Sequence, residues 1–320
     1  MPTSKPQRQK RLFQSLGQPP LIFTTASHNS GDASSHVAFV ANALKAGFSA
    51  IDASNNDEFP HREDWVGNGI REAIQSQGVK REQIVVQTTC RWPAFPGNSY
   101  QDLPKAEKAI EEHVHAAIKN SLRNLRHEET EKSSNIDLVL LDAPSPAYVS
   151  THTPNSLDAL TLAAWRVLES YVPTQIRHLG VRNFSNLKRL SELHRNALVK
   201  PAVALRAFGP AGQWDLPMRA FCGREGIMYA ASGVSNGVNE GLMRATPVAL
   251  LAQFAGVEGA GAVTALLVAM GVPVVLDEES VEVGSVAKRR EEVKRVQAWA
   301  EEKEDTWTTL FDDFVHLVRT

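Results

Sequence analysis

The sequence predicts a single (β/α)8 barrel, also called a TIM barrel, which belongs to the α/β class. Short apolar runs rich in β-forming residues alternate with segments of helical periodicity, as they do when crossover helices join parallel strands. The chain has 320 residues, and a barrel of this kind commonly takes about 250. No repeat or change of composition divides it. We therefore expect one barrel domain with C-terminal helices over residues 19–320, after a flexible tail over residues 1–18.

Eight segments have the length and composition of buried strands, which is the number that closes this type of barrel. They are residues 21–26, 50–53, 84–88, 138–141, 176–181, 202–205, 227–230 and 272–276. Between them, apolar residues recur at helical spacing, for example Val37, Val40, Ala41 and Leu44, which share one face of a helix. The final segment, residues 286–318, predicts one or two charged amphipathic helices, broken around Asp305. Each predicted strand therefore has a helix to connect it to the next.

The composition excludes several classes of protein. Hydrophobic residues make up 42% and charged residues 22% of the chain, as in an ordinary globular protein. The net charge of −2 is spread over both halves, so we expect no nucleic-acid partner. Cys90 and Cys222 are the two cysteines, too few for a disulfide framework and without the spacing of a metal site. These features favour a reducing compartment, with the cytoplasm as the expected location.

Neither the N-terminal residues nor the longest apolar stretch predicts contact with a membrane. Residues 1–12 are polar and basic with no apolar run after them, unlike a signal peptide. Residues 247–276 are strongly apolar, but Glu258, several glycines and Pro273 interrupt them before 18 residues accumulate. We interpret this stretch as a buried helix and strand. The expected partner is a small-molecule metabolite, and the sequence leaves the oligomeric state open.

Five sequence landmarks occur in a fixed order along the chain. The first is "AGFSAIDAS" followed by "HREDWVGNGI"; then come "IVVQTTC", "SLRNL" leading to "IDLVLLDAP", "AWRVLESYVPTQIRHLGVRNF" and "KPAVA". Together they cover about residues 19–277 and resemble the aldo-keto reductases, with a middle portion similar to fungal members. The resemblance implies the same (β/α)8 barrel, with carbonyl reduction by NADPH as the conventional activity.

The resemblance assigns four catalytic positions, of which this chain retains one. In the family a Tyr protonates the carbonyl oxygen, a Lys paired with an Asp tunes that Tyr, and a His orients the carbonyl. The Asp is present as Asp52. Other residues stand at the remaining three positions: the Tyr falls at His61, or at residues 59–60 in other spacings, the Lys at Thr89 or Cys90, and the His at Asp142.

The positions that the resemblance assigns to the cofactor are also largely replaced. Asn183 is retained where the family holds the nicotinamide amide, but the neighbouring Ser is Arg182 and the Gln after "KPAV" is Leu205. The Tyr that would stack on the nicotinamide is replaced around Ala231. Acidic residues 277–279 stand where a Lys commonly meets the 2′-phosphate, and they would repel it. The sequence therefore predicts weak or absent NADPH binding.

Asp52, His61 and Asp142 are the candidate catalytic residues. Asp52 ends a predicted strand at the end of the barrel where such enzymes keep their chemistry. Asp142 ends an apolar run, so it must be paired or have a shifted pKa if it is buried. An imidazole titrates at about pH 6.5, which suits His61 to proton exchange near neutral pH. Each residue also has a simpler interpretation: a structural carboxylate for Asp52 and Asp142, and a solvated loop side chain for His61.

Thr89, Cys90, Trp92 and Arg182 are the candidate substrate-binding residues. Trp92 comes just after the third predicted strand, so among the tryptophans it is the best placed to line a pocket. Arg182 ends the fifth, where its guanidinium can bind a substrate carboxylate or pair with Asp52 or Asp142. Cys90 is a nucleophile only if a nearby base or cation lowers its pKa, and otherwise it is a small buried side chain.

Three functions are consistent with these residues. The first is a non-redox enzyme of the lyase, isomerase or cyclase type, in which His61 and a carboxylate act as an acid/base pair on a fungal-type secondary metabolite. The second is a catalytically silent pseudoenzyme that binds a metabolite or partner. The third is the conventional NADP-dependent oxidoreductase, with His61 as the proton donor, and it is the alternative to the first two. In the first two, no cofactor is expected; in the third, the cofactor is NADPH.

Overall fold

The computed structural model describes residues 20–25, 32–53, 62–92, 103–127, 135–143, 154–184, 186–210, 212–276 and 283–319. The predicted tail over residues 1–18 lies outside these ranges, as does His61. Eight parallel strands pair in sequence order, and the last pairs with the first to close a barrel. The predicted (β/α)8 fold is therefore confirmed.

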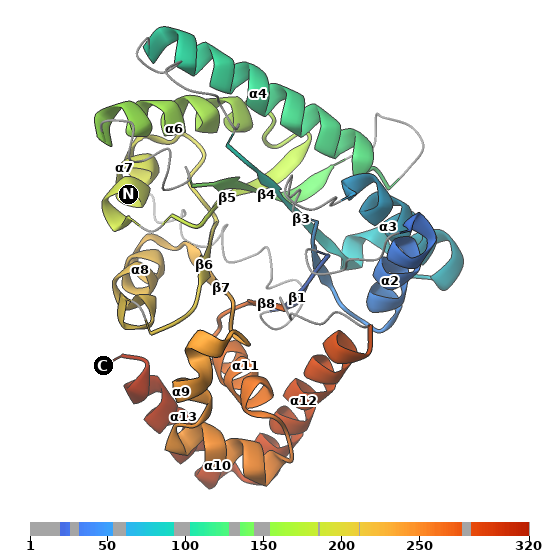
Figure 1. Ribbon diagram of the computed structural model, residues 1–320, viewed down its shortest axis with the longest axis vertical. Helices are drawn as coiled ribbons and strands as arrows, with labels where there is room; N and C mark the ends of the chain where they lie inside the picture. The colour runs from blue at the N-terminus through green and yellow to red at the C-terminus, as the bar shows by residue number, and fades with distance from the viewer. Residues whose placement is uncertain are drawn as a thin grey trace, which may run out of the picture.

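The strands alternate with helices that form an outer ring (Figure 1). The strands are β1 Leu21–Thr24, β2 Ala50–Asp52, β3 Val85–Cys90, β4 Ile136–Asp142, β5 Ile176–Arg182, β6 Val203–Ala207, β7 Met228–Ser232 and β8 Val274–Leu276. The helices are α2 Ala33–Lys45, α3 Glu63–Gln77, α4 Leu103–Asn124, α6 Pro154–Glu169, α7 Leu187–Asn196, α8 Gly212–Glu225, α9 Glu240–Met243, α10 Thr246–Ala255, α11 Gly259–Ala269, α12 Val283–Glu302 and α13 Glu304–Leu317.

The apolar stretch 247–276 contains α10, α11 and β8, and α11 is almost wholly buried, as the sequence predicts. The final segment breaks at Lys303, between α12 and α13, two residues before the predicted position. Among the described residues, no single helix is long and apolar enough to cross a membrane; α10 and α11 pass that test only as a pair bent by 103°.

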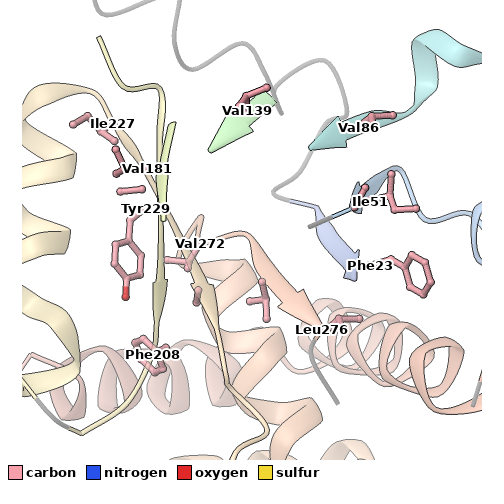
Figure 2. Close-up of a cluster of buried hydrophobic side chains, with 14 of the residues drawn as sticks. Phe23, Ile51, Val86, Val139, Val181, Phe208, Ile227, Tyr229, Val272 and Leu276 are labelled. Atoms are coloured by element: carbon pink, nitrogen blue, oxygen red, sulfur yellow. The ribbon is translucent and has the colours of Figure 1, made fainter. Parts of the chain in front are cut away.

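Strand side chains are apolar on both faces, because a parallel barrel is covered by helices outside and filled by side chains inside. One cluster fills the interior: Ile22, Ala50, Val85, Leu138, Leu140, Ala202, Val203, Leu205, Ala230 and Val275. The alternate residues, such as Phe23, Ile51 and Val86, belong to the larger cluster between barrel and helices (Figure 2). This alternation determines which residues at the strand ends face the interior.

Two glycines allow close approaches that position the strands and helices. At Gly67 in α3, a Cβ atom would lie 1.9 Å from the carbonyl oxygen of Asn124, at the end of α4. At Gly180 in β5, it would lie 2.7 Å from both Leu140 Cδ2 and Val203 O. Gly67 is the glycine of the Val-Gly pair in the first landmark. The close packing of α3 against the end of α4 explains why a glycine stands there.

A charge cluster fastens the N-terminal ends of β3, β4 and β5. The carboxylate of Asp137 is buried; Oδ2 accepts hydrogen bonds from Arg81 Nη2 at 2.6 Å and from Val86 N at 2.9 Å. Oδ1 accepts a hydrogen bond from Arg177 Nη1 at 2.8 Å. We call Arg81, Asp137 and Arg177 the base clamp. It lies at the opposite end of the strands from the candidate site described next.

Candidate active site

The predicted site residues that the structure describes lie at the C-terminal ends of neighbouring strands. Asp52, Asp142 and Arg182 are the last residues of β2, β4 and β5, and Thr89 is the last but one of β3. Successive strand residues point alternately into and out of the barrel, and these four side chains fall on the inward positions of their strands. For example, Asp52 and Asp142 come two residues after Ala50 and Leu140, which lie in the interior cluster. We call this end of the barrel the mouth. The predicted grouping of Asp52, Thr89, Asp142 and Asn183 at one end is confirmed.

Arg182 and Asp52 form an ion pair across the mouth. Arg182 Nη1 donates to Asp52 Oδ2 at 2.9 Å and to Thr89 Oγ1 at 3.3 Å. The Asp52 side chain is 0% exposed and that of Arg182 is 22% exposed. Removing one partner would leave a buried charge uncompensated, at a cost of about 3–5 kcal/mol. Of the interpretations that the sequence left open for Arg182, the structure shows pairing with Asp52.

Asp142 is held by one of its two carboxyl oxygens. Its Oδ1 accepts hydrogen bonds from Asn183 Nδ2 and from the backbone N–H of Ala143, both at 3.0 Å. No described residue donates to Oδ2. Asn183 has a φ of 59°, a left-handed conformation that Asn tolerates better than most residues, and it follows β5 directly. The turn thus places the Asn183 amide against Asp142.

The pKa of Asp142 is raised above its ordinary value, chiefly because burial disfavours the carboxylate. The positive charges of Arg182 and Arg91 oppose this shift, as do the hydrogen bonds from Asn183 and the N–H of Ala143. Since both donors to the carboxyl group contact Oδ1, the proton of the neutral form belongs on Oδ2. Burial thus shifts Asp142 toward the neutral carboxylic acid, in which Oδ2 carries the proton.

The segment after β3 is fixed on two sides. Trp92 Nε1 donates to the carbonyl oxygen of Asp142 at 2.6 Å. His113, from α4, places its Nε2 3.0 Å from the carbonyl oxygen of Arg91. His113 and His115 are both half-buried, and His115 Nδ1 lies 2.8 Å from the hydroxyl of Tyr171. Contacts of a histidine with a backbone carbonyl oxygen or a tyrosine hydroxyl leave no periodic pattern in the sequence. These two contacts could therefore not be predicted from it.

Cys90 faces away from the mouth. It belongs to the outer core cluster, and burial raises the pKa of its thiol to about 12, with the nearby carboxyl groups of Asp142 and Glu63 adding to the shift. A thiol in this state is protonated near neutral pH and is not a nucleophile. Of the two residues that could stand in the lysine position, Thr89 is the one that faces the interior. The structure gives Cys90 no contact with the mouth to support substrate binding.

Glu63 is a buried carboxyl group that the sequence analysis did not single out. It begins α3 and accepts hydrogen bonds from Thr88 Oγ1 at 2.8 Å and from Asn124 Nδ2 at 3.3 Å. Burial raises its pKa above the ordinary value for Glu. These bonds tie β3 to α3 and α4 behind the sheet, so we regard Glu63 as structural. Its position at the start of a helix after a predicted strand is the signal that could have identified it.

Two of the predictions concern residues outside the described ranges. His61 precedes α3, and residues 277–279 follow β8. The pairing of His61 with a carboxylate and the repulsion of a 2′-phosphate by the acidic cluster therefore stay predictions. Among the residues that are described, no group of three or more His, Cys, Asp or Glu side chains could hold a metal ion.

Comparison with known proteins decides the family. The sequence profile of the Aldo/keto reductase family matches residues 21–237, well over half of the chain. The chain belongs to this family. No curated protein in the comparison matches it significantly.

Three aldo-keto reductase structures share the fold of this family member. The aldose reductase of Schistosoma japonicum is 18% identical with a TM-score of 0.62, over 87% of this chain and 88% of that one. The enzyme MGS-M4, from a Medee basin deep-sea metagenome library, is 20% identical with a TM-score of 0.59, over 87% and 90%. The Brucella melitensis aldo/keto reductase is 19% identical with a TM-score of 0.60, over 88% and 93%. At these identities the likeness concerns the fold alone.

The positions implied for the nicotinamide are apolar or already paired in this aldo-keto reductase barrel. Leu205 is buried in the interior apolar cluster, and Ala231 is fully buried in the outer cluster. The amide of Asn183 donates to Asp142. Arg182, at the position that the resemblance assigns to a serine, is bound to Asp52 and Thr89. These residues do not fit a nicotinamide amide, which needs polar partners.

Proposed function

We propose that this barrel is a non-redox enzyme that performs acid/base chemistry on a small organic metabolite, with Asp142 holding and transferring the proton. The observation that carries the proposal is the arrangement of the Asp142 carboxyl group. Two N–H donors fix its Oδ1, no described residue donates to Oδ2, and burial favours its neutral form. A carboxylic acid with a raised pKa is a general acid suited to neutral pH. Lyase, isomerase and cyclase reactions all use such a group.

The other residues of the mouth have distinct roles in this proposal. Asp52 is bound to Arg182 and fully buried, so we assign it to positioning Arg182. Asn183 and the N–H of Ala143 orient the Asp142 carboxyl group. Asp142 is therefore a better carboxylate partner for His61 than Asp52 is. His61 remains our predicted second acid/base group.

The conventional alternative, reduction of a carbonyl by NADPH, has the family membership and the retained Asn183 in its favour. The residues of the mouth favour the non-redox function, because a threonine and an aspartate replace the family's Lys and His and the amide of Asn183 is engaged by Asp142. A silent protein that binds a metabolite is the remaining possibility. Turnover without a cofactor would distinguish the non-redox enzyme from such a silent binding protein.

The test is turnover of candidate carbonyl and hydroxyl metabolites without cofactor, followed by NMR or mass spectrometry. Asp142→Asn keeps an oxygen for the two N–H donors and places an N–H₂ group where Oδ2 stood, but it cannot transfer a proton. We expect it to lower kcat by about 10²–10⁴-fold, the usual contribution of a general acid. His61→Ala should lower kcat in the same direction.

Asp158→Asn is the matched control. Asp158 lies on α6, where it pairs with Arg189, and it has no contact with the mouth. It should keep wild-type turnover. Full activity of both Asp142→Asn and His61→Ala would reject the acid/base mechanism.

A further inference from the structure

A cavity of about 380 Å³ lies on the outside of the barrel, between α6 and α7. The two helices pack against each other in the outer ring (Figure 1). Lys188, Arg189 and Leu193 line the cavity from α7, and Ala159 and Leu162 line it from α6. Sites for small molecules usually enclose about 300–1,000 Å³. We call this space the outer cavity; none of its lining residues belongs to a strand or to the mouth.

The guanidinium of Arg189 is nearly buried in the wall of the outer cavity, yet it makes a single hydrogen bond to the described part of the protein. The side chain is 12% exposed, and its Nε donates to Asp158 Oδ1 at 3.2 Å. No described residue accepts a hydrogen bond from Nη1 or Nη2. Polar groups that are largely removed from water normally have partners. The fork of Nη1 and Nη2 matches the two oxygens of a carboxylate.

The charges around the outer cavity favour a ligand with one negative charge. Two carboxylates line it, those of Asp158 and Glu192. Asp158 pairs with Arg189, and Glu192 pairs with Arg195. Lys188 also lines the cavity and has no ion-pair partner among the described residues. One positive charge is therefore left over, which a single carboxylate would balance and a doubly charged phosphate would exceed.

The rest of the lining suits the carbon skeleton of such a ligand. Ala159, Leu162 and Leu193 give the outer cavity an apolar surface beside the guanidinium. Asn196 lines its far end, seven residues after Arg189 on α7, and this separation corresponds to about 10 Å along a helix. A carboxylate on a small ring or short chain spans much of this length. Contact with the apolar side chains would remove its carbon atoms from water, which favours binding.

We infer that the outer cavity binds a small organic carboxylate. The carboxylate group lies against Nη1 and Nη2 of Arg189, close to the ammonium group of Lys188, and the carbon skeleton lies over Ala159, Leu162 and Leu193. The Asp158 carboxylate orients the guanidinium through Nε and leaves the other edge of the fork for the ligand. This site goes beyond the proposed function and does not depend on it, because it shares no residue with the mouth.

The experiment uses benzoate as the probe, and benzamide, which has the same ring without the charge, as the matched ligand. The intact protein is titrated with each ligand and followed by ¹H–¹³C NMR of its leucine methyl groups. We expect benzoate to bind about tenfold more tightly than benzamide, or better. The methyl signals of Leu162 and Leu193 should shift, because the aromatic ring lies beside them. Equal affinity for the two ligands, or shifts that leave out both leucines, would overturn the inference.

Three variants test the two parts of the site separately. Arg189→Gln removes the guanidinium and should weaken benzoate binding about tenfold or more, while benzamide binds as before. Ala159→Phe keeps the guanidinium but fills the outer cavity, so it should abolish the binding of both ligands. Lys188→Gln changes an exposed residue and should weaken benzoate binding a few-fold.

Arg123→Gln is the matched control for Arg189→Gln. Arg123 is an exposed residue of α4 that donates to Asn120, so this variant loses the same charge on a different helix. It should bind benzoate as the wild type does, and circular dichroism checks that every variant is folded. An equal loss of benzoate affinity in Arg123→Gln and Arg189→Gln would reduce the effect to nonspecific attraction of an anion. Wild-type affinity in both Arg189→Gln and Ala159→Phe would refute the placement of the ligand.

Discussion

At the scale of single residues, two side chains at the mouth depend on each other. Thr89 faces the interior on β3 at the position that the resemblance assigns to a lysine, and the guanidinium of Arg182 from β5 donates to both Thr89 and Asp52. The aspartate therefore keeps a cationic partner although the partner comes from another strand. Sequence reasoning could place Arg182 at the mouth but could not choose its partner, because strand alternation determines the direction of a side chain and not its rotamer.

The raised pKa of Asp142 predicts a pH-dependent difference in stability between the wild type and Asp142→Asn. An ordinary Asp has a pKa of about 3.9, and burial raises that of Asp142 in the folded state. Below the unfolded value both states are protonated and the carboxyl group costs nothing. As the pH rises through the folded pKa, the wild type loses stability relative to the variant, by about 1.4 kcal/mol for each unit of difference.

Denaturant unfolding of both proteins at pH 4 and pH 7 measures this difference, and ¹³C NMR of the Asp142 carboxyl group measures its pKa directly. The groups that face the carboxyl are Arg182, Arg91, Asn183 and the N–H of Ala143. A titration midpoint at or below 3.9 would show that the two guanidinium groups outweigh burial.

At the scale of elements, much of the barrel could be predicted from the sequence. The order of strands and helices follows from hydrophobic periodicity, and the position of Asp52, Asp142 and Asn183 follows from the rule that parallel strands end on the same side. The division of the apolar stretch 247–276 into α10 and α11 was not predicted, because both helices are apolar and the stretch was interpreted as one buried helix and a strand. Gly256, which ends α10 with a φ of 63°, and Glu258, which precedes α11, are the signals that could have located the junction.

One local structure could not be predicted at all. At the start of α8, Gln213, Trp214 and Asp215 all have positive φ, although none is glycine. Such a conformation costs roughly 1–2 kcal/mol per residue. Contacts with nearby segments hold it: Arg206, nine residues earlier on β6, binds both oxygens of Asp215, and Arg219, five residues later in α8, donates to the carbonyl oxygen of Trp214. These side-chain contacts override the backbone preference here.

The packing of α3 on α4 makes a prediction that belongs to this scale. In Gly67→Ala the new Cβ would lie 1.9 Å from the backbone oxygen of Asn124, so the two helices must separate. We expect a loss of about 1–3 kcal/mol or more in the free energy of unfolding. Gly223→Ala is the matched control, because a Cβ there meets nothing within 4 Å inside α8. It should be neutral or add about 0.5–1 kcal/mol, and a similar result for both variants would contradict this account of helix packing.

At the scale of the whole molecule, the fold is that of a reductase family, whereas the residues at its mouth favour a different chemistry. The family and the barrel are those of aldo-keto reductases, yet the interior near the mouth offers apolar or paired side chains at the positions implied for the cofactor. A fold supports many chemistries, and the residues of the site decide which one operates.

We therefore predict weak or absent binding of NADPH. Fluorescence titration with NADPH and NADH, using the intact protein, measures the affinity for each. The acidic residues 277–279 should make NADPH the weaker ligand, since each unfavourable charge contact costs on the order of 1 kcal/mol or more when partly desolvated. A submicromolar dissociation constant for NADPH would show that the position of the 2′-phosphate has been assigned incorrectly and would restore the reductase hypothesis.

The base clamp has a consequence for how this protein can change. Arg81, Asp137 and Arg177 join three strands at the end of the barrel that faces away from the mouth, so much of the local stability is independent of the residues that meet a ligand. Substitutions at the mouth can then accumulate while the barrel stays folded, which is a condition for a scaffold to acquire a new reaction. A library randomised at Thr89 and Asp142, with the ion pair of Arg182 and Asp52 kept, should therefore contain many folded members, whereas one randomised at the clamp should contain few.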